Sequence, residues 1–234
     1  MLDTNFWKNY FTAYDVLNIV IPYQELLNII ATAFEIEEGE RILDAGSGTG
    51  NLAIKLEKIG AKVTALDSSR EGLTCHKEKY PSAETVLHDL TKPLPFQNGY
   101  FDKIVSNNTI YTIAPEKRPG VFKEFYRVLK PGGKIVISNV HVGFKPFEIY
   151  KEHIKREKEL IGTLHTIAKV VRMLPPTTKM FYYNAKIKKE HREGDYGFMK
   201  ESDQEDLLLG AGFKNISENR LVYARQGILN TAEK

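Results

Sequence analysis

The segment Arg41-Ile-Leu-Asp-Ala-Gly-Ser-Gly-Thr-Gly50 decides the fold of this 234-residue chain. Its first five residues are typical of a short β-strand, and glycines follow at positions 46, 48 and 50. Glycine adopts backbone conformations that a Cβ atom excludes, so this pattern predicts a tight turn at which a ligand approaches the backbone. A helix starting near Gly50 would direct unpaired backbone N–H groups at that ligand. The segment therefore predicts a strand–turn–helix unit that binds a small molecule.

Short β-rich runs alternate with helical stretches after this turn, which is typical of a parallel sheet covered on both faces. Helices are predicted to begin near Gly50, Ser69 and Glu116, and Pro131-Gly132-Gly133 is expected to end a helix sharply. The fold class predicted is α/β, with a doubly wound, mostly parallel seven-stranded sheet. Its strands are predicted at 41–45, 62–66, 85–88, 103–106 and 134–139, with two more after Gly212-Phe213.

Two segments flank this alternating pattern within a single predicted domain of residues 1–234. Residues 1–38 are predicted to form an N-terminal helical region whose apolar side chains pack on the sheet. Residues 144–200 are basic and aromatic, and we expect an inserted helical lid that Pro175-Pro176 divides into two halves. A helix over 201–211 would then resume the alternation. An insertion this long after the fifth strand would cross above the predicted site.

Acidic residues at the ends of later strands predict a nucleoside-containing ligand. Asp67 ends the second strand, seventeen residues beyond Gly50, where a carboxylate can accept both hydroxyls of a ribose. The same acid could cap the helix that starts near Ser69, and both roles could hold at once. Dinucleotide-binding turns carry a third glycine at the position held here by Asn51, so the pattern disfavours NAD.

The Gly-x-Gly-x-Gly turn preceded by Asp44 resembles the first motif of class I S-adenosylmethionine-dependent methyltransferases. Later stretches resemble further elements of that family in the same order, namely His88-Asp89-Leu90, 100–108 and 129–138. Upstream, Tyr14-Asp-Val-Leu-Asn18 is similar to the opening of the ubiquinone/menaquinone-biosynthesis type, whose N-terminal helix closes over the cofactor. An ordinary surface helix with Tyr14 packed inward is the alternative.

This resemblance implies a Rossmann-like fold, S-adenosylmethionine as cofactor and methyl transfer as the activity. It places the Asp67 carboxylate at the ribose, the Asp89 carboxylate at the adenine amino group and the backbone N–H of Leu90 at the adenine ring. The cofactor-binding residues that it implies are Tyr14, Asp44, Gly46, Ser47, Gly48, Asp67, Ser68, Asp89, Leu90 and Asn107.

Methyl transfer is a direct displacement that needs an aligned nucleophile and an active site without water. A histidine or tyrosine near the methyl group could also take a proton from the acceptor. We name two catalytic candidates, Tyr111 after the fourth strand and His141 after the fifth, because loops at the carboxyl ends of strands line the ligand crevice. Many relatives carry histidine after the fourth strand, where this chain has Ile110-Tyr-Thr-Ile113, so an inherited base is doubtful.

Charge and composition bear on the acceptor. Residues 151–200 carry a net charge of +6 and the remainder −3, which indicates an anionic partner or a solvated helix face. With its aromatic residues, the insertion favours a small-molecule or lipid-like acceptor, anionic or aromatic, or a lid resting on a membrane surface. An amphipathic helical cap without a binding role fits the insertion equally well. The sequence does not determine the oligomeric state.

Two other classes of function stay open. Phe181-Tyr-Tyr183, Tyr196 and Phe198 in the basic insertion are compatible with an RNA- or nucleic-acid-modifying enzyme. Ser106-Asn-Asn-Thr, however, differs from the Asn/Asp-Pro-Pro-aromatic motif typical of base amino-group methylation. A non-catalytic cofactor-binding protein is the third class.

The cysteine content and the apolar segments of the chain bear on its location and on metal binding. A single cysteine, Cys75, fits a reducing cytoplasm and makes a thiolate metal site improbable, so no metal is expected. We also expect neither a signal peptide nor a transmembrane span.

Overall fold

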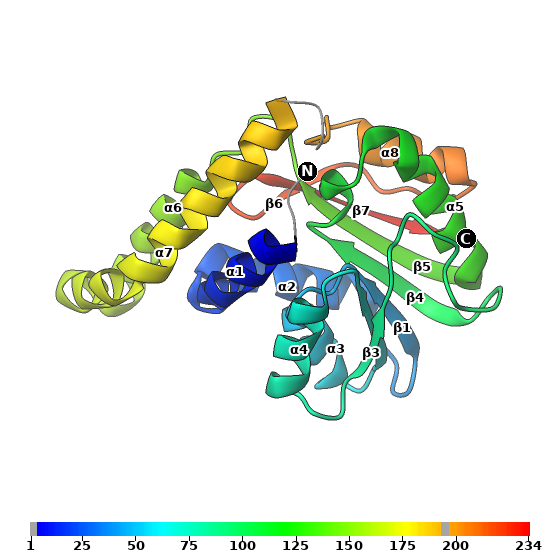
Figure 1. The fold of residues 1–234 in the computed structure, drawn as a ribbon, viewed down its shortest axis with the longest axis horizontal. Coiled ribbons are helices and arrows are strands. Elements are labelled where there is room, and N and C mark those ends of the chain that lie inside the picture. The colour runs from blue at the N-terminus through cyan, green and yellow to red at the C-terminus, as the bar shows by residue number, and fades with distance from the viewer. Residues whose placement is uncertain (1–3, 193–196) are drawn as a thin grey trace.

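The computed structural model describes residues 4–192 and 197–234. Its centre is a seven-stranded sheet in the order β3-β2-β1-β4-β5-β7-β6 (Figure 1). Strands β1 to β5 run parallel, and β7 pairs antiparallel with β5 and β6. The predicted mostly parallel, doubly wound fold is confirmed. The strands are β1 (Arg41–Ala45), β2 (Lys62–Asp67), β3 (Glu84–Leu87), β4 (Phe101–Asn107), β5 (Leu129–Val140), β6 (Arg220–Val222) and β7 (Gly227–Glu233).

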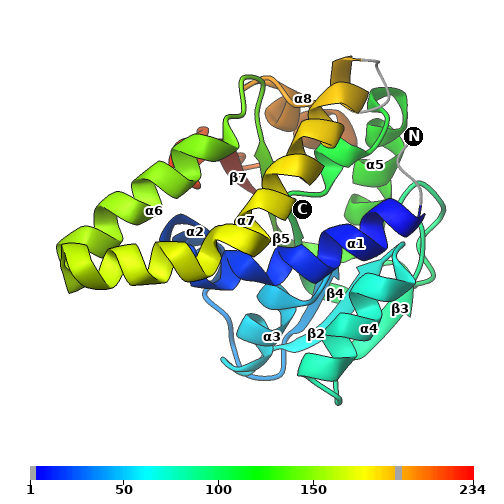
Figure 2. The same ribbon diagram turned by 60° about the vertical axis from the view of Figure 1, so that its left-hand side comes forward.

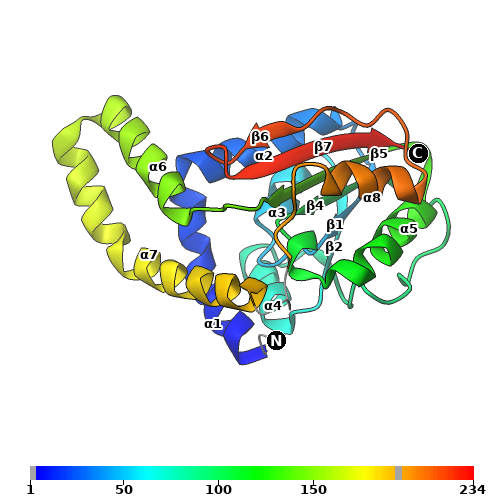
Figure 3. The same ribbon diagram turned by 90° about the horizontal axis from the view of Figure 1, so that it is seen from above.

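Helices cover both faces of this sheet. Helices α2 (Ile21–Phe34) and α3 (Asn51–Glu57) lie on one face, and α5 (Arg118–Val128) and α8 (Asp203–Ala211) on the other (Figures 1 and 3). Helix α4 (Arg70–Lys79) connects β2 to β3. Central strands are apolar on both sides because both sides are covered, and Ile42 and Leu43 are fully buried. The carboxyl ends of β1 to β5 therefore meet at one edge.

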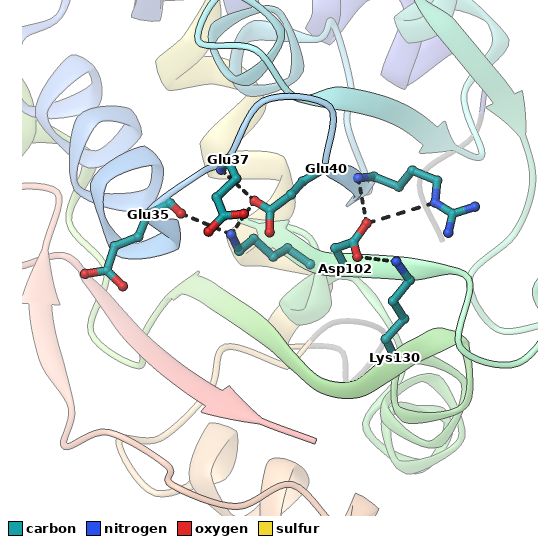
Figure 4. A network of polar contacts seen from close by, with 7 residues as sticks. Glu35, Glu37, Glu40, Asp102 and Lys130 are labelled. Carbon is teal, nitrogen blue, oxygen red and sulfur yellow. Dashed lines mark hydrogen bonds and ion pairs between the residues drawn. The ribbon is translucent and has the colours of Figure 1, made fainter.

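A polar network fixes the opposite edge of the sheet (Figure 4). The Asp102 carboxylate accepts the backbone N–H of Arg41 at 2.9 Å and pairs with Lys130, while Lys103 pairs with Glu40. Burial opposes ionisation of Asp102, but the hydrogen bonds from Lys130 and Arg41 and their charges outweigh it and lower its pKa. This network ties the starts of β1 and β4 together, away from the carboxyl ends.

The N-terminal segment folds as α1 (Thr4–Tyr14), the 3-10 helix η1 (Asp15–Ile19) and α2. Helix α2 buries Leu26, Ile30 and Phe34 in the core. Among the described residues, no single helix is long and apolar enough to cross a membrane. Within the described parts of the chain, one pair of helices, Asn9–Ile19 and Ile21–Phe34, bent by 84°, reaches that length and composition together.

The insertion forms a helical hairpin, α6 (Pro146–Ile161) and α7 (Thr163–Arg192), that projects from the body beside α1 (Figures 2 and 3). The predicted division at Pro175-Pro176 is wrong, because α7 continues through both prolines. The chain reverses instead at Gly162, whose φ is +77°. A buried row at Met173, Met180 and Ile187 spans the proline pair, and this packing offsets the two lost backbone hydrogen bonds.

The segment Pro131-Gly132-Gly133 also differs from expectation. Helix α5 already ends at Val128, and β5 begins at the next residue. Leu129 pairs with Phe101, and the ladder resumes only at Lys134 opposite Lys103. The three residues thus form an irregularity within β5, where extra residues oppose a shorter partner segment.

Candidate functional site

A cavity of about 600 Å³ opens at the carboxyl ends of the parallel strands. This volume suits a small-molecule ligand. Its walls come from β1, β2 and β4 and the segments that follow β1 to β4 on one side, and from α1, α2, α6 and α7 on the other. The structure brings all ten residues proposed for cofactor binding to this one cavity, together with Tyr111: Tyr14, Asp44, Gly46, Ser47, Gly48, Asp67, Ser68, Asp89, Leu90 and Asn107.

Packing within the protein requires glycine at two positions of the glycine-rich turn. Gly46 has a φ of +84°, and a Cβ atom there would lie 2.2 Å from Cγ2 of Thr109. Gly50 has a φ of +75°, and its Cβ atom would lie 2.2 Å from the His76 ring. Both contacts are far shorter than van der Waals distance. A side chain is therefore excluded at both positions by the protein itself.

Five residues that line the cavity each carry a buried polar atom without a hydrogen-bond partner among the described residues. Three of these atoms belong to the strand ends and the glycine-rich turn, namely Oδ2 of Asp44, Oγ of Ser47 and Oδ1 of Asn107, and the other two are Nδ2 of Asn51 and the Tyr150 hydroxyl. Buried polar groups are normally satisfied, so such a cluster indicates a ligand that supplies the missing partners. Burial, followed by the nearby Asp67 charge, raises the pKa of Asp44 to about 7. A cationic ligand group would restore its ionised form.

Asp67 holds the glycine-rich turn through a hydrogen bond to its backbone. Its Oδ2 accepts the backbone N–H of Gly48 at 2.8 Å, and its Oδ1 accepts that of Ser69 at 2.7 Å. The helix cap expected as an alternative role belongs to the Ser69 hydroxyl, which accepts the N–H of Gly72 at 3.2 Å. Each carboxylate oxygen has a second lone pair, so Asp67 keeps capacity for ribose hydroxyls. Burial raises its pKa despite these hydrogen bonds.

The segment that follows Tyr14 fastens the N-terminal helices to the glycine-rich turn. Asp15 accepts the Thr49 hydroxyl and the Lys79 ammonium group, both at 3.0 Å. Asn18 donates to the Asn51 side chain at 3.1 Å. The acid and the amide of the Tyr-Asp-x-x-Asn motif thus both contact the turn or the first residue of α3. This docking places α1 over the cavity.

Asp89 and Leu90 lie at the end of the cavity formed after β3. The Asp89 side chain is exposed, and its Oδ1 accepts the backbone N–H of Thr91 at 2.8 Å. Leu90 is buried. An exposed acid beside a buried apolar residue suits the edge and face of a flat heterocyclic ring. It suits the charged end of a ligand less well.

The opposite wall of the cavity is mainly aromatic and was largely missed by the sequence reasoning. Tyr14 contacts Tyr23 through the two hydroxyl groups at 3.4 Å. Burial raises the pKa of Tyr10, Tyr14 and Tyr223 well above the usual value and that of Tyr150 to about 12. These hydroxyls therefore stay protonated at neutral pH. The wall residues missed were Tyr10, Phe11, Leu17, Tyr23, Phe144, Ile149, Tyr150, Met180, Asn184 and Tyr223.

The two catalytic candidates have different positions. Tyr111 lies in the 3-10 helix η2 (Ile110–Thr112), lines the cavity and stacks on Phe198 with ring centroids 5.5 Å apart. His141 does not line the cavity. Its Nδ1 lies 2.7 Å from the carbonyl oxygen of Val142, and its Nε2 lies 3.0 Å from that of Arg225. Val140 and Phe144 on either side of it line the cavity, whereas both ring nitrogens of His141 face carbonyl groups of residues that do not.

The aromatic residues of the insertion form a packing surface. Phe181 packs on Tyr150 with ring centroids 5.2 Å apart, and Tyr183 packs on Phe6 and Tyr10 of α1. Tyr182 is exposed, and Tyr196 lies outside the described residues. Phe181 therefore joins α7 to α6, and Tyr183 joins α7 to α1, so both rings are engaged in packing within the protein.

Cationic groups and metal ligands are sparse at the site. Of the described lining residues, one is a lysine, Lys117, and none is an arginine. No group of three or more histidine, cysteine or acidic side chains in the described chain could hold a metal ion. The excess positive charge of the insertion thus lies mainly on the outside of the hairpin.

Known proteins support the family suggested by these residues. A model described as a methyltransferase domain matches residues 43–137. Demethylmenaquinone methyltransferase from Renibacterium salmoninarum is 31% identical over 61% of this chain and 61% of its own length. The protein of the same name from Chlorobaculum tepidum is 32% identical over 76% of this chain and 68% of its own length. The chain thus matches about 60% of the length of several relatives.

Solved structures agree on the fold. A SAM-dependent methyltransferase from Aquifex aeolicus superposes with a TM-score of 0.59 at 18% identity, covering 94% of this chain and 92% of that one. Identity this low supports the fold alone. Together with the sequence relatives, the glycine-rich turn and the strand-end acids, it confirms the predicted resemblance, and the chain belongs to the class I S-adenosylmethionine-dependent methyltransferases.

Proposed function

We propose that this protein transfers the methyl group of S-adenosylmethionine to an apolar, aromatic small molecule. The observation that carries the proposal is one continuous cavity with two unlike walls. One wall holds the predicted cofactor residues with their partnerless polar atoms, and the other is built of tyrosine, phenylalanine and aliphatic side chains. A polar cofactor and an apolar acceptor would thus be held side by side.

The cofactor wall fits S-adenosylmethionine part by part. Asp44, Ser47 and Asn107 would hold the amino-acid end, whose charged and donor groups satisfy their unpaired atoms. Asp67 would accept the ribose hydroxyls, and Asp89 with Leu90 would contact the adenine. When bound, the cofactor supplies an activated methyl group on a sulfonium centre.

The aromatic wall supports an apolar ring as the acceptor. Protonated tyrosine hydroxyls donate hydrogen bonds, so they would orient a carbonyl or hydroxyl oxygen of the acceptor rather than remove its proton at neutral pH. We assign acceptor contact to Tyr111, whose backbone N–H is fixed by Oδ1 of Asn139 at 3.3 Å. Catalysis would then rest on alignment and on exclusion of water. Relatives named demethylmenaquinone methyltransferases make a quinone-related ring a reasonable acceptor.

We infer that the α6–α7 hairpin is a lid that governs acceptor recognition. Ile149 and Tyr150 of α6 and Met180 and Asn184 of α7 line the cavity. Such a position suits a segment that covers the acceptor and excludes water.

The test is a methyl-transfer assay with labelled S-adenosylmethionine and three acceptor pools: aromatic quinol-type molecules, RNA and protein. Label should enter the quinol pool, and Tyr111→Phe should raise KM for the acceptor while S-adenosylhomocysteine affinity stays unchanged. Label in RNA alone would support the nucleic-acid alternative. Tight S-adenosylhomocysteine binding without transfer to any pool would support a non-catalytic role.

A further inference from the structure

Large apolar side chains are exposed in two rows on the α6–α7 hairpin. Leu164 is 82% exposed and Phe147 63%. Spacings of three, four or seven residues keep each row on one face of its helix. A contiguous exposed apolar surface of this kind marks an interaction site. This apolar hairpin face consists of Phe147, Ile154 and Ile161 on α6, and Leu164, Ile167, Val171 and Leu174 on α7.

The apolar hairpin face points away from the body of the protein. On α6, His153 faces α2, where its Nδ1 lies 3.3 Å from the backbone nitrogen of Ile21, and Tyr150 faces α7. On α7, Tyr183 packs on α1. At about 100° per residue, each exposed row lies on the side of its helix turned from α1 and α2. Helices α6 and α7 are antiparallel neighbours (Figure 3). We therefore expect the two exposed rows to form one surface.

Basic side chains border this face. Lys151 precedes Ile154 by three residues and Lys158 follows it by four, which keeps both beside the α6 row. Both are exposed, although Lys151 also reaches Glu148 at 3.5 Å. Exposed Arg172 and Lys179 lie seven residues apart on one flank of the α7 row. Of the four acids of α6, those at positions 148, 152 and 159 lie on one flank away from the exposed row, and Glu157 is buried and paired with Lys169.

We propose that the apolar hairpin face docks on the surface of an anionic lipid bilayer. Apolar side chains with a basic border match the boundary between acyl chains and anionic headgroups. A second copy of the chain fits less well, because a twofold contact through this face would bring its basic borders together. Helices α6 and α7 also line the cavity, so docking would bring the acceptor wall near the bilayer. Only that last role, delivery of an apolar acceptor, rests on the proposed function.

Co-sedimentation of the full chain with vesicles tests the docking. Vesicles of phosphatidylcholine with about one third phosphatidylglycerol should bind the protein at least about tenfold more tightly than pure phosphatidylcholine, and salt should weaken the binding. The double variant Leu164→Glu and Val171→Glu should lose it. Leu209→Glu is the matched control, since Leu209 is 65% exposed on α8, away from the hairpin (Figure 1), and it should bind as the parent does.

Each variant is also titrated with S-adenosylhomocysteine and examined by light scattering. Unchanged ligand affinity in the double variant shows that it is folded and that the cofactor site is intact, whatever the vesicles show. Docking is refuted if the parent protein does not bind anionic vesicles. It is also refuted if Leu209→Glu loses vesicle binding as much as the double variant does. A dimer that the double variant abolishes, without vesicle binding by the parent, would assign the face to a second copy instead.

Discussion

Gly46→Ala tests whether packing against Thr109 requires glycine at this position of the glycine-rich turn. The substitution places a Cβ atom in a backbone conformation with φ of +84° and within 2.2 to 2.6 Å of three Thr109 side-chain atoms. The left-handed conformation costs about 1 to 2 kcal/mol for a residue with a Cβ atom. Overpacking adds about 1 to 3 kcal/mol. We therefore expect a loss of about 2 to 5 kcal/mol in the free energy of unfolding.

Gly39→Ala is the matched control, because Gly39 has the same φ of +84° and nothing lies within 4 Å of its Cβ position. Only the backbone cost of about 1 to 2 kcal/mol should remain there. Urea unfolding of both variants measures the difference. Thr109→Gly, introduced with Gly46→Ala, should recover part of the loss, whereas Thr109→Ala should recover less because its own Cβ atom lies 2.6 Å away. Equal destabilisation of the Gly46 and Gly39 variants would refute the packing argument.

Three further predictions concern the cofactor wall and the hairpin. Asp67→Ala should weaken S-adenosylhomocysteine binding by roughly 1 to 3 kcal/mol, and Asp89→Ala by less because water can replace an exposed contact; calorimetry that finds full affinity in a folded Asp67 variant removes the ribose assignment. The pKa of Asp44 is about 7 in the folded protein and 3.8 in the unfolded chain. Between these pH values the folded state binds the proton more tightly, so the free energy of unfolding should fall as pH rises from 3.8 to about 7. A cationic ligand group would displace that proton, so affinity should rise toward pH 7 and level off above it, and Asp44→Asn should flatten the profile. Replacing residues 147–192 with a Gly/Ser linker should abolish methyl transfer and leave S-adenosylhomocysteine affinity within about tenfold; a shortened protein that methylates normally contradicts the lid.

Much of the cofactor wall could be predicted from sequence because its signals are local. A strand, a glycine-rich turn and a helix follow one another between Arg41 and Glu57, and each is specified by neighbouring residues. Asp67 and Asp89 follow the next two strands. Carboxyl ends of parallel strands meet at one edge, so the fold class was enough to bring these residues together.

The acceptor wall could not be predicted in the same way. Tyr150 reaches the cavity from α6 and Tyr223 from the segment between β6 and β7, and nothing in their sequence neighbours marks them. His141 looked equivalent to Tyr111, but its ring nitrogens contact the carbonyl groups of Val142 and Arg225, and it does not line the cavity. A side chain's place there depends on packing between distant segments.

The sequence by itself determined the order of the elements, the glycine-rich turn and the acids at the strand ends, because these follow from backbone preferences and hydrophobic spacing over a few residues. Only the tertiary structure decided why Gly46 and Gly50 tolerate no side chain, since the atoms that exclude one belong to Thr109 and His76. It also decided that α7 continues through two prolines, because a buried row of side chains crosses them. Such outcomes depend on contacts between residues far apart in the chain, where packing outweighs local preference.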